Sequence, residues 1–280
     1  MSVFVGVDVG GSKVLAAVVS PAGEVVRSVL ARTPGRLVES TVVEDVMTDA
    51  VLSVADGETI KAIGVAAAGF VDERGERVVF APHLPWRDED VRSRLAERWG
   101  TPVVLDNDAN CTAVAEATYG VAGGDGTSVV VTMGTGIGGA LLVDGRVLRG
   151  RNGMAGEFGH MQVVPDGQPC QCGARGCWEQ YASGSALVRY ARSQVGLEPS
   201  VLTEACGVGL ANLVAALDPH RIVVGGGVSA AGDRLLDPAR AELQRSVVAA
   251  GHRVVPPVLA ARLGPEAGVV GAAELARRSL

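Results

Sequence analysis

Residues 4–19, FVGVDVGGSKVLAAVV, contain two apolar runs separated by the dipeptide Gly10-Gly11. A second turn, residues 21–23 (PAG), leads into the apolar pair Val25-Val26. Short apolar runs bounded by tight turns predict three neighbouring strands that form a meander.

The same plan returns at residues 128–148. The apolar runs 128–133 and 138–143 flank a glycine-rich turn, and a second turn at 144–145 leads into residues 147–148. Asp8 and Thr132 occupy equivalent places before the two glycine-rich turns. The repetition predicts an internal duplication, in which two domains share one architecture.

Helical and extended patterns alternate through the rest of both halves. Helices are predicted at 38–55, 89–99, 184–195, 201–217, 235–248 and from 267, and strands at 61–66, 102–105, 221–224 and 258–263. This order predicts two mixed α/β domains with a cleft between them. We expect a small domain at 1–108, on which a C-terminal helix at 267–280 packs, and a large domain at 109–266.

Composition restricts the protein's partners and compartment. The formal net charge of the 280 residues is −6 and no basic block occurs, which argues against nucleic acid or an anionic membrane as a partner. No signal peptide and no uninterrupted apolar run of membrane-spanning length are present. Three of the five cysteines lie between residues 170 and 177, which does not fit a disulfide framework. We therefore expect a cytoplasmic protein.

The first glycine-rich turn is a candidate phosphate-binding loop. Glycines allow the backbone to approach a phosphate, and side-chain donors beside them add hydrogen bonds. These residues are Gly10, Gly11, Ser12 and Lys13. Asp8 could hold Mg²⁺ through water. The turn taken alone is more typical of an ordinary hairpin.

The second glycine-rich turn strengthens the interpretation as a nucleotide site. It contains Thr132, Gly134, Thr135, Gly136 and Gly138, more glycine and threonine than a hairpin needs. Two such loops at duplicated positions suggest two hairpins that bind one polyphosphate from opposite walls of the cleft. A third cluster, Gly225, Gly226 and Gly227, follows an apolar strand, and its bare backbone could pack on a flat base.

The segment Asp106-Asn107-Asp108-Ala109-Asn110 follows a strand and opens a helix. Asp and Asn are common helix N-caps, but one cap needs only one such residue. In a cleft, Asn107 could bind sugar hydroxyls and Asp108 could take the proton from an attacking hydroxyl. General-base catalysis of this kind is worth about 10²- to 10⁴-fold.

A cysteine cluster indicates a metal site. His160, Cys170, Cys172 and Cys177 match the donor set of a closed, structural Cys₃His zinc site, whereas scattered buried thiols would have no reason to flank a glycine-rich knuckle. Glu157 and Glu179 flank the cluster, so zinc could fix both carboxylates toward sugar hydroxyls. His160 has two ring nitrogens and could bind zinc with one and sugar with the other.

Together these motifs resemble the ROK family, in particular its bacterial glucokinases, over nearly the whole chain. The resemblance implies a two-domain actin-like (ribonuclease H-like) ATPase fold, phosphorylation of a hexose 6-hydroxyl by Mg-ATP and a homodimer. It further implies Asp108 as the base, zinc on the Cys₃His cluster, and sugar contacts from Asn107, Glu157, His160 and Glu179. Gly69 lies in a stretch that resembles the family's sugar-side loop, although Ala68 and His83 replace a common proline and a common asparagine.

One region departs from the family pattern. Between Tyr190 and Leu210 the chain is shorter than typical relatives by about one helical hairpin. The resemblance implies that this hairpin belongs to the nucleotide side of the large domain. We therefore expect an active kinase with weakened or altered nucleotide binding.

Other functions fit parts of the same pattern. A sugar-responsive repressor of the family would need a helix-turn-helix module, and the first strand begins at Phe4 without room for one. A non-catalytic sugar-binding protein fits the shortened region. Within the kinase class, glucose is the expected acceptor, with mannose, fructose, allose or an N-acetyl sugar as alternatives, and polyphosphate is an alternative donor.

Overall fold

The structure, a computed structural model, describes residues 2–192 and 200–280. The chain divides into two compact units. Unit 1 consists of Met1–Gly120, Val147–Ala155 and Glu266–Leu280, and unit 2 consists of Val121–Arg146 and Gly156–Pro265.

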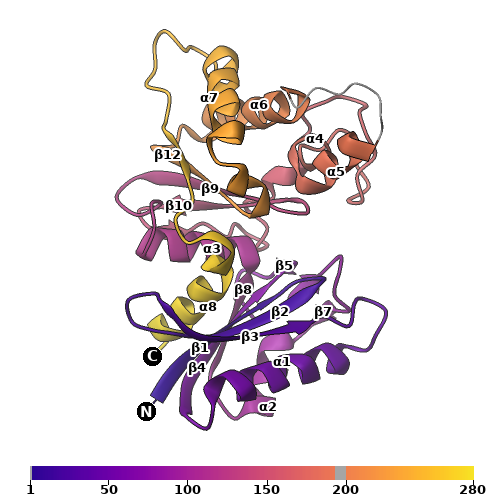
Figure 1. The fold of residues 1–280 in the computed structure, drawn as a ribbon, viewed down its shortest axis with the longest axis vertical. Coiled ribbons are helices and arrows are strands. Elements are labelled where there is room, and N and C mark those ends of the chain that lie inside the picture. Colours follow the sequence, from indigo (N-terminus) through magenta and orange to yellow (C-terminus); the bar gives the residue numbers. More distant parts are fainter. Residues whose placement is uncertain (1, 193–199) are drawn as a thin grey trace. The chain divides into compact units, whose positions relative to one another are not determined.

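Unit 1 is built on a five-stranded sheet in the order β3-β2-β1-β4-β8 (Figure 1). The strands are β1 (Ser2–Val9), β2 (Lys13–Val19), β3 (Val25–Arg32), β4 (Thr59–Ala67) and β8 (Val103–Asn107). β1, β2 and β3 pair antiparallel as the predicted meander, whereas β4 and β8 extend the sheet in parallel. A second sheet, unpredicted from the sequence, contains β5 (Phe70–Val71), β6 (Val78–Phe80) and β7 (Arg87–Glu89).

Helices cover both faces of the five-stranded sheet. They are α1 (Ser40–Ala55), α2 (Val91–Trp99), α3 (Asp108–Thr118) and α8 (Ala267–Arg278). Because side chains alternate along a strand, Val5, Val7 and Val9 of β1 enter the aliphatic core that includes α1. On the other face, a Cβ at Gly6 would overlap the backbone of α8, so α8 lies close against the sheet.

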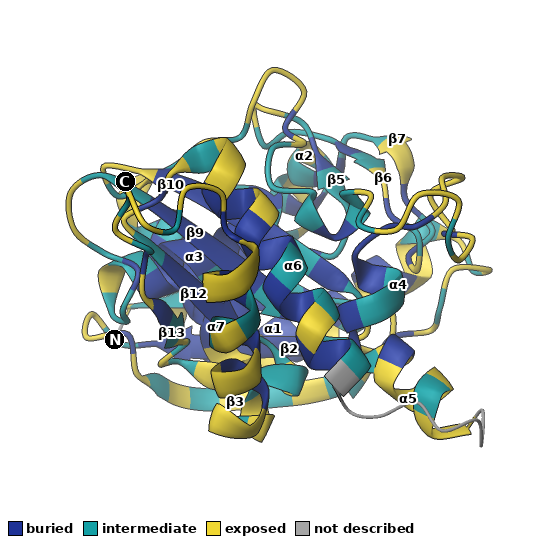
Figure 2. Ribbon diagram, turned by 90° about the horizontal axis from the view of Figure 1, so that it is seen from above, coloured by how far each residue is buried: buried dark blue, intermediate teal, exposed yellow. Residues whose placement is uncertain are grey.

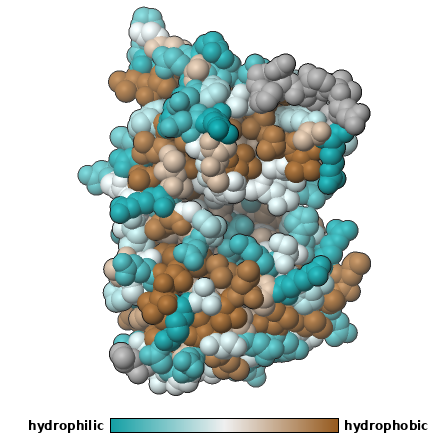
Figure 3. Space-filling model, in the orientation of Figure 1, coloured by the Kyte–Doolittle hydropathy of each residue, from teal (hydrophilic) through white to brown (hydrophobic). Residues whose placement is uncertain are grey.

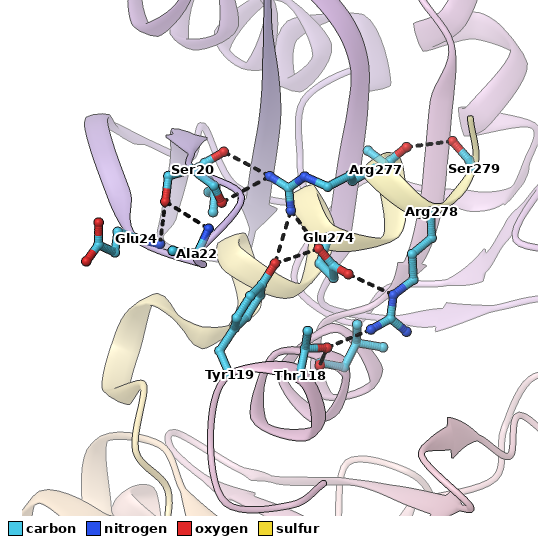
Figure 4. A network of polar contacts seen from close by, with 12 residues as sticks. Ser20, Ala22, Glu24, Thr118, Tyr119, Glu274, Arg277, Arg278 and Ser279 are labelled. Atoms are coloured by element: carbon cyan, nitrogen blue, oxygen red, sulfur yellow. Dashed lines mark hydrogen bonds and ion pairs between the residues drawn. The ribbon is translucent and has the colours of Figure 1, made fainter.

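The end of α8 is fastened by a polar network (Figure 4). Glu274 accepts hydrogen bonds from the Tyr119 hydroxyl (2.6 Å) and from Arg277 (2.6 Å). Arg277 also donates to the backbone carbonyls of residues 19 and 20 in the β2–β3 turn. The carboxylate of Glu274 also accepts from Arg278 (2.8 Å). The network thus joins α8, the end of α3 and the meander.

Unit 2 repeats the plan of unit 1. Its sheet has the order β11-β10-β9-β12-β13. The strands are β9 (Thr127–Met133), β10 (Ile137–Val143), β11 (Arg146–Val147), β12 (Arg221–Gly225) and β13 (Val258–Ala260). β10 pairs antiparallel with β9, and β12 pairs parallel with both β9 and β13. Asp8 and Thr132 are each the penultimate residue of the central strand, so the predicted equivalence is confirmed.

Short and long helices complete unit 2. They are η1 (Phe158–His160), α4 (Glu179–Ala182), α5 (Gly184–Arg192), α6 (Ser200–Leu217), η2 (Gly227–Ala231) and α7 (Asp233–Ser246), and η3 (Gly264–Glu266) precedes α8. Buried residues concentrate in the strands and on the sheet-facing sides of the helices (Figure 2). Part of the predicted helix 184–195 and much of the predicted shortening lie at 193–199, outside the described residues.

The boundary between the units differs from the predicted one. Residues 109–120 belong to unit 1 because α3 packs against α8, a contact between distant parts of the chain that local patterns do not reveal. Residues 147–155 also belong to unit 1. Helix α8 belongs to unit 1, where it contacts β1 and β4.

Most apolar side chains are buried, but the edge strand β3 exposes Val26 and Leu30. Figure 3 shows apolar surface on the part of unit 1 that contains β2 and β3. Among the described residues, no helix combines the length and apolar character that crossing a lipid bilayer requires.

Candidate functional site

The junction of β8 and α3 presents Asp108. Asn107 is the N-cap of α3, and its Oδ1 accepts from the backbone N–H groups two (2.9 Å) and three (3.1 Å) residues further on. Its Nδ2 donates to the Gly69 carbonyl (3.0 Å) and to Asp108 Oδ1 (3.0 Å). Asn107 therefore fixes the partly exposed carboxylate of Asp108 and the position of Gly69 together.

The other two polar residues of the motif are structural. Asp106 is 3% exposed and accepts from Asn110 Nδ2 (2.8 Å) and from the Asn107 backbone N–H (2.8 Å). Its other oxygen pairs with Arg149, whose Nε lies at 3.0 Å. Sequence reasoning missed Arg149, because nothing local connects it with a residue 43 positions earlier. The motif thus combines a buried ion pair, a cap and the partly exposed carboxylate of Asp108.

Asp8 lies at the same end of unit 1. The pKa of the Cys111 thiol is raised, mainly because the thiol is buried. The negative charges of Asp106, Asp8 and Asp108 nearby raise it further. Burial also raises the pKa of Asp8 to about 6, although Lys13 opposes the shift. A carboxylate that is costly to ionise without a counter-charge is suited to binding a cation.

The loop after Asp8 is held by its backbone. The Gly10 N–H donates to the Lys13 carbonyl (3.0 Å), and the Thr33 hydroxyl donates to the Gly10 carbonyl (2.7 Å). Gly11, Ser12 and Lys13 are exposed. A Cβ at Gly11 would overlap His83, so the exposed His83 packs against this loop.

Unit 2 contains a pocket of about 960 Å³ beside the second glycine-rich loop. Three of the predicted nucleotide-binding residues line it, namely Gly134, Thr135 and Gly227. The other candidates of unit 2 lie in or near the loop: Thr132 pairs with Gly138 and Gly225 in the sheet, and Gly226 adopts φ +85° against the backbone of Met133. The volume falls within the range of small-molecule sites.

One wall of the pocket was missed by sequence reasoning. It is the face of α5 that presents residues at helical spacing: Ser185, Val188, Arg189 and Arg192, preceded by Gly184. Val228 of η2 also lines the pocket. The pocket therefore offers aliphatic contact from Val188 and Val228 and cationic groups from two arginines.

The predicted metal ligands lie together in unit 2. One donor atom each from His160, Cys170, Cys172 and Cys177 lies within 4.8 Å of all the others. The two measured pairs are Cys172 Sγ to Cys177 Sγ (3.6 Å) and Cys170 Sγ to His160 Nδ1 (3.7 Å). Zn–S and Zn–N bonds of ordinary length in a tetrahedron give about 3.8 Å and about 3.6 Å for such pairs. These residues fit zinc.

Two carboxylates flank the imidazole of His160. Nε2 lies 3.9 Å from Glu157 Oε2, and Nδ1, on the side of the thiols, lies 4.0 Å from Glu179 Oε1. Burial raises the pKa of Glu157. The nearby Glu179 reinforces this shift, whereas His160 opposes it. The carboxylates of Glu157 and Glu179 are thus placed on the two sides of one ring, as the proposed double role of His160 requires.

Comparisons with known proteins assign the family. A sequence model of the ROK family matches residues 4–202 and 199–279. The glucokinase of Streptomyces coelicolor is 38% identical over 314 aligned positions, which cover 99% of this chain and 98% of the relative. The chain therefore belongs to the ROK family, as its motifs predicted.

Solved structures agree with this assignment. The crystal structure of a ROK family glucokinase from Streptomyces griseus in complex with glucose and AMPPNP has a TM-score of 0.90 and 38% identity, over 99% of both chains. The ROK hexokinase from Thermus thermophilus has a TM-score of 0.79 and 35% identity, over 99% of this chain and 98% of that chain. The predicted actin-like fold is confirmed.

The comparisons also bear on chain length. The two matches to the family overlap at residues 199–202, and the alignment with the S. coelicolor glucokinase has more positions than this chain has residues. That relative therefore contains residues that this chain lacks. This agrees with a chain shortened between Tyr190 and Leu210.

Proposed function

We propose that the protein is an ATP-dependent sugar kinase that transfers the γ-phosphoryl group of Mg-ATP to the 6-hydroxyl of glucose. The observation that carries the proposal is the carboxylate of Asp108, fixed by Asn107 at the start of α3, in a chain similar over 99% of its length to a glucokinase crystallised with glucose and AMPPNP.

Asp108 is the proposed general base. It accepts the proton of the 6-hydroxyl as the oxygen attacks the γ-phosphorus, and the terminal phosphoryl group leaves ADP. Phosphoryl transfer depends mainly on positioning and electrostatic stabilisation, so a fixed carboxylate is a suitable base. The hydrogen bond from Asn107 Nδ2 (3.0 Å) orients Asp108 Oδ1.

Each unit contains candidates for recognition of the remaining sugar hydroxyls. In unit 1 these are Asn107 and the backbone at Gly69, and in unit 2 they are Glu157, His160 and Glu179. Each carboxylate can accept hydrogen bonds from two neighbouring hydroxyls. A site that pairs every hydroxyl discriminates strongly against a sugar that lacks one.

The donor would occupy the pocket of unit 2. Val188 and Val228 would contact the adenine ring, and the loop at Gly134–Gly136 would hold phosphates. In unit 1, Gly10, Gly11, Ser12 and Lys13 remain candidates for phosphate contacts. Asp8 would hold Mg²⁺ through water, and that ion would supply charge neutralisation for the phosphates. The ionised form of Asp8 would be favoured by the cation.

His160 and the three cysteines would hold zinc as a structural ion. A closed Cys₃His site leaves no position for substrate, so its contribution is to order the loop between Glu157 and Glu179. We further propose that the protein is a cytoplasmic homodimer.

The test is a reaction of the purified chain with Mg-ATP and a panel of hexoses, in which glucose 6-phosphate is detected by its enzymatic oxidation. We expect turnover with glucose, and less with mannose, fructose, allose and N-acetylglucosamine. Polyphosphate replaces ATP in a parallel series. Turnover confined to another hexose or to polyphosphate would correct the substrate, and glucose binding without turnover would identify a non-catalytic sugar-binding protein.

A further inference from the structure

Glu179 connects the metal site with the donor loop. Its Oε1 lies 3.3 Å from Cys170 Sγ. Its Oε2 lies beside Gly136, where an added Cβ would be 2.6 Å from that oxygen. The Glu179 side chain is only 9% exposed, so both contacts are made in a largely buried setting. One carboxylate therefore contacts a predicted metal ligand with one oxygen and the predicted phosphate loop with the other.

The backbone makes a second connection between the same two places. Helix α4 begins at Glu179 and is followed by Ser183 and then by α5. The Gly184 N–H donates to the Gly134 carbonyl (2.8 Å), and the Ser185 N–H donates to the Thr135 carbonyl (3.3 Å). A Cβ at Gly184 would lie 2.7 Å from the Gly134 oxygen, so the two segments are in close contact.

Side chains fix α5, which forms a wall of the pocket, to α4. Arg189 donates to the Gln180 carbonyl, and the Tyr190 hydroxyl donates to the Tyr181 carbonyl (3.3 Å). Gln180 Nε2 in turn lies 3.5 Å from Cys170 Sγ. The predicted metal ligand Cys170 is thus joined to the pocket wall through Gln180 and its partner Arg189 on α5.

We propose that the Cys₃His metal site controls the affinity of the protein for its phosphoryl donor, with Glu179 as the positioning residue between them. Loss of the metal would release Cys170 and Glu179, and the Gly134–Gly136 loop and α5 would lose their shared support. This inference rests on the proposed function in one respect, that the pocket of unit 2 binds a nucleotide. It predicts that metal binding changes the affinity for the phosphoryl donor. A metal site that supported only sugar binding would leave that affinity unchanged.

The first experiment measures the affinity for Mg-AMPPNP by isothermal titration without sugar. The zinc-loaded chain is compared with the same chain after zinc removal by a chelator that does not bind Mg²⁺. We expect the dissociation constant to rise about 10-fold, within the usual range for coupled sites. Equal affinities would overturn the inference, whereas absence of binding to the zinc-loaded chain would overturn the proposed function.

The second experiment uses the reciprocity of coupling and needs no altered chain. If zinc strengthens nucleotide binding, the nucleotide must strengthen zinc binding by the same factor. We expect saturating Mg-AMPPNP to raise the zinc affinity about 10-fold, measured by competition with a chromophoric chelator. Zinc affinity that responds to glucose alone would overturn the proposal.

Two cysteine variants distinguish the effect of losing the metal from the effect of losing a thiol elsewhere in the chain. Cys172→Ala removes the exposed ligand and should reproduce the weak donor binding of the zinc-free chain. Cys111→Ala removes a buried thiol of unit 1 and should keep both zinc and donor affinity. Circular dichroism verifies that both variants are folded. Donor affinity unchanged in a folded, zinc-free Cys172→Ala chain would contradict the proposal.

Discussion

The two glycine-rich loops occupy the same place in two sheets of the same topology, yet they carry different chemistry. The loop of unit 1 follows Asp8, a carboxylate whose pKa burial raises to about 6, and it exposes Ser12 and Lys13. The loop of unit 2 follows the neutral Thr132 and opens on a pocket of about 960 Å³. The two loops therefore share a backbone plan but differ in their side chains, with a buried carboxylate before one and a neutral threonine before the other.

The means of support differ as well. In unit 1 the site depends on charge, because Asp106 and Arg149 form an ion pair under the β8–α3 junction. In unit 2 the loop is held by backbone hydrogen bonds from α5 and by close packing against Gly226. We therefore expect substitution of Asp108 in unit 1 to affect the chemical step and substitutions along the pocket of unit 2 to affect donor affinity.

The largest expected effect follows the substitution Asp108→Asn. It removes the base and preserves the size of the side chain, so kcat should fall about 10²- to 10⁴-fold. The dissociation constant for glucose, measured by isothermal titration, should change little. Near-normal kcat would reject Asp108 as the base.

The next effect concerns the ion pair of unit 1. Arg149→Met leaves Asp106 buried without its partner, which should lower the free energy of unfolding by about 3 kcal/mol. Chemical denaturation measures this change. The control is Arg151→Met in the same segment, where the arginine is exposed. Equal stability of the two variants would show that the Asp106–Arg149 pair does not support the junction.

A smaller effect concerns Asp8 and pH. The pKa of Asp8 rises on folding from its ordinary value of 3.8 to about 6. Above about pH 6 the folded chain must hold this buried carboxylate ionised, whereas the unfolded chain ionises it freely. Asp8→Asn should therefore raise the free energy of unfolding by about 2 kcal/mol at pH 7 in metal-free buffer.

The gain in the free energy of unfolding from Asp8→Asn should disappear as the pH falls from 6 to below 4. Below pH 4, Asp8 of the wild type is protonated in both the folded and the unfolded chain. Denaturation at several pH values tests this sign. The variant Asp125→Asn supplies a control for the loss of an exposed carboxylate. A stability difference that grows toward acid pH would contradict the assigned direction.

The smallest effect concerns the pocket wall of unit 2. Val188 and its neighbour Leu187 are similarly exposed, at 49% and 46%, but only Val188 lines the pocket. Val188→Ala removes apolar contact with the base and should weaken Mg-AMPPNP binding about 5-fold. Leu187→Ala should leave the affinity unchanged. Equal weakening in both variants would place the base elsewhere.

Much of the fold and of the candidate site could be predicted from the sequence, because the patterns that indicate them are local. Glycine turns between apolar runs predicted both loops and their equivalence. The spacing of three cysteines after His160 predicted a cluster that the structure brings within 4.8 Å. The Asp106–Asn110 motif predicted a helix start with more polar groups than a cap requires.

The features that escaped prediction all depend on contacts between distant parts of the chain. Arg149 gives no local sign that it pairs with Asp106, and Thr33 gives none that it holds the Gly10 carbonyl. The boundary at residue 108 differed from the structure because α3 packs on α8, which is more than 140 residues away. The packing of the exposed His83 on Gly11 likewise follows from loop geometry that the sequence does not show.

The division of roles between the two units is tested most directly by measuring two quantities in two variants. The quantities are the single-turnover rate of glucose phosphorylation and the dissociation constant for Mg-AMPPNP, and the variants are Asp108→Asn and Thr132→Val. We predict that Asp108→Asn loses the transfer rate and keeps donor affinity, while Thr132→Val weakens donor affinity about 5-fold, the loss of one hydrogen bond, and keeps the rate at saturating ATP. The reverse pattern would contradict the account.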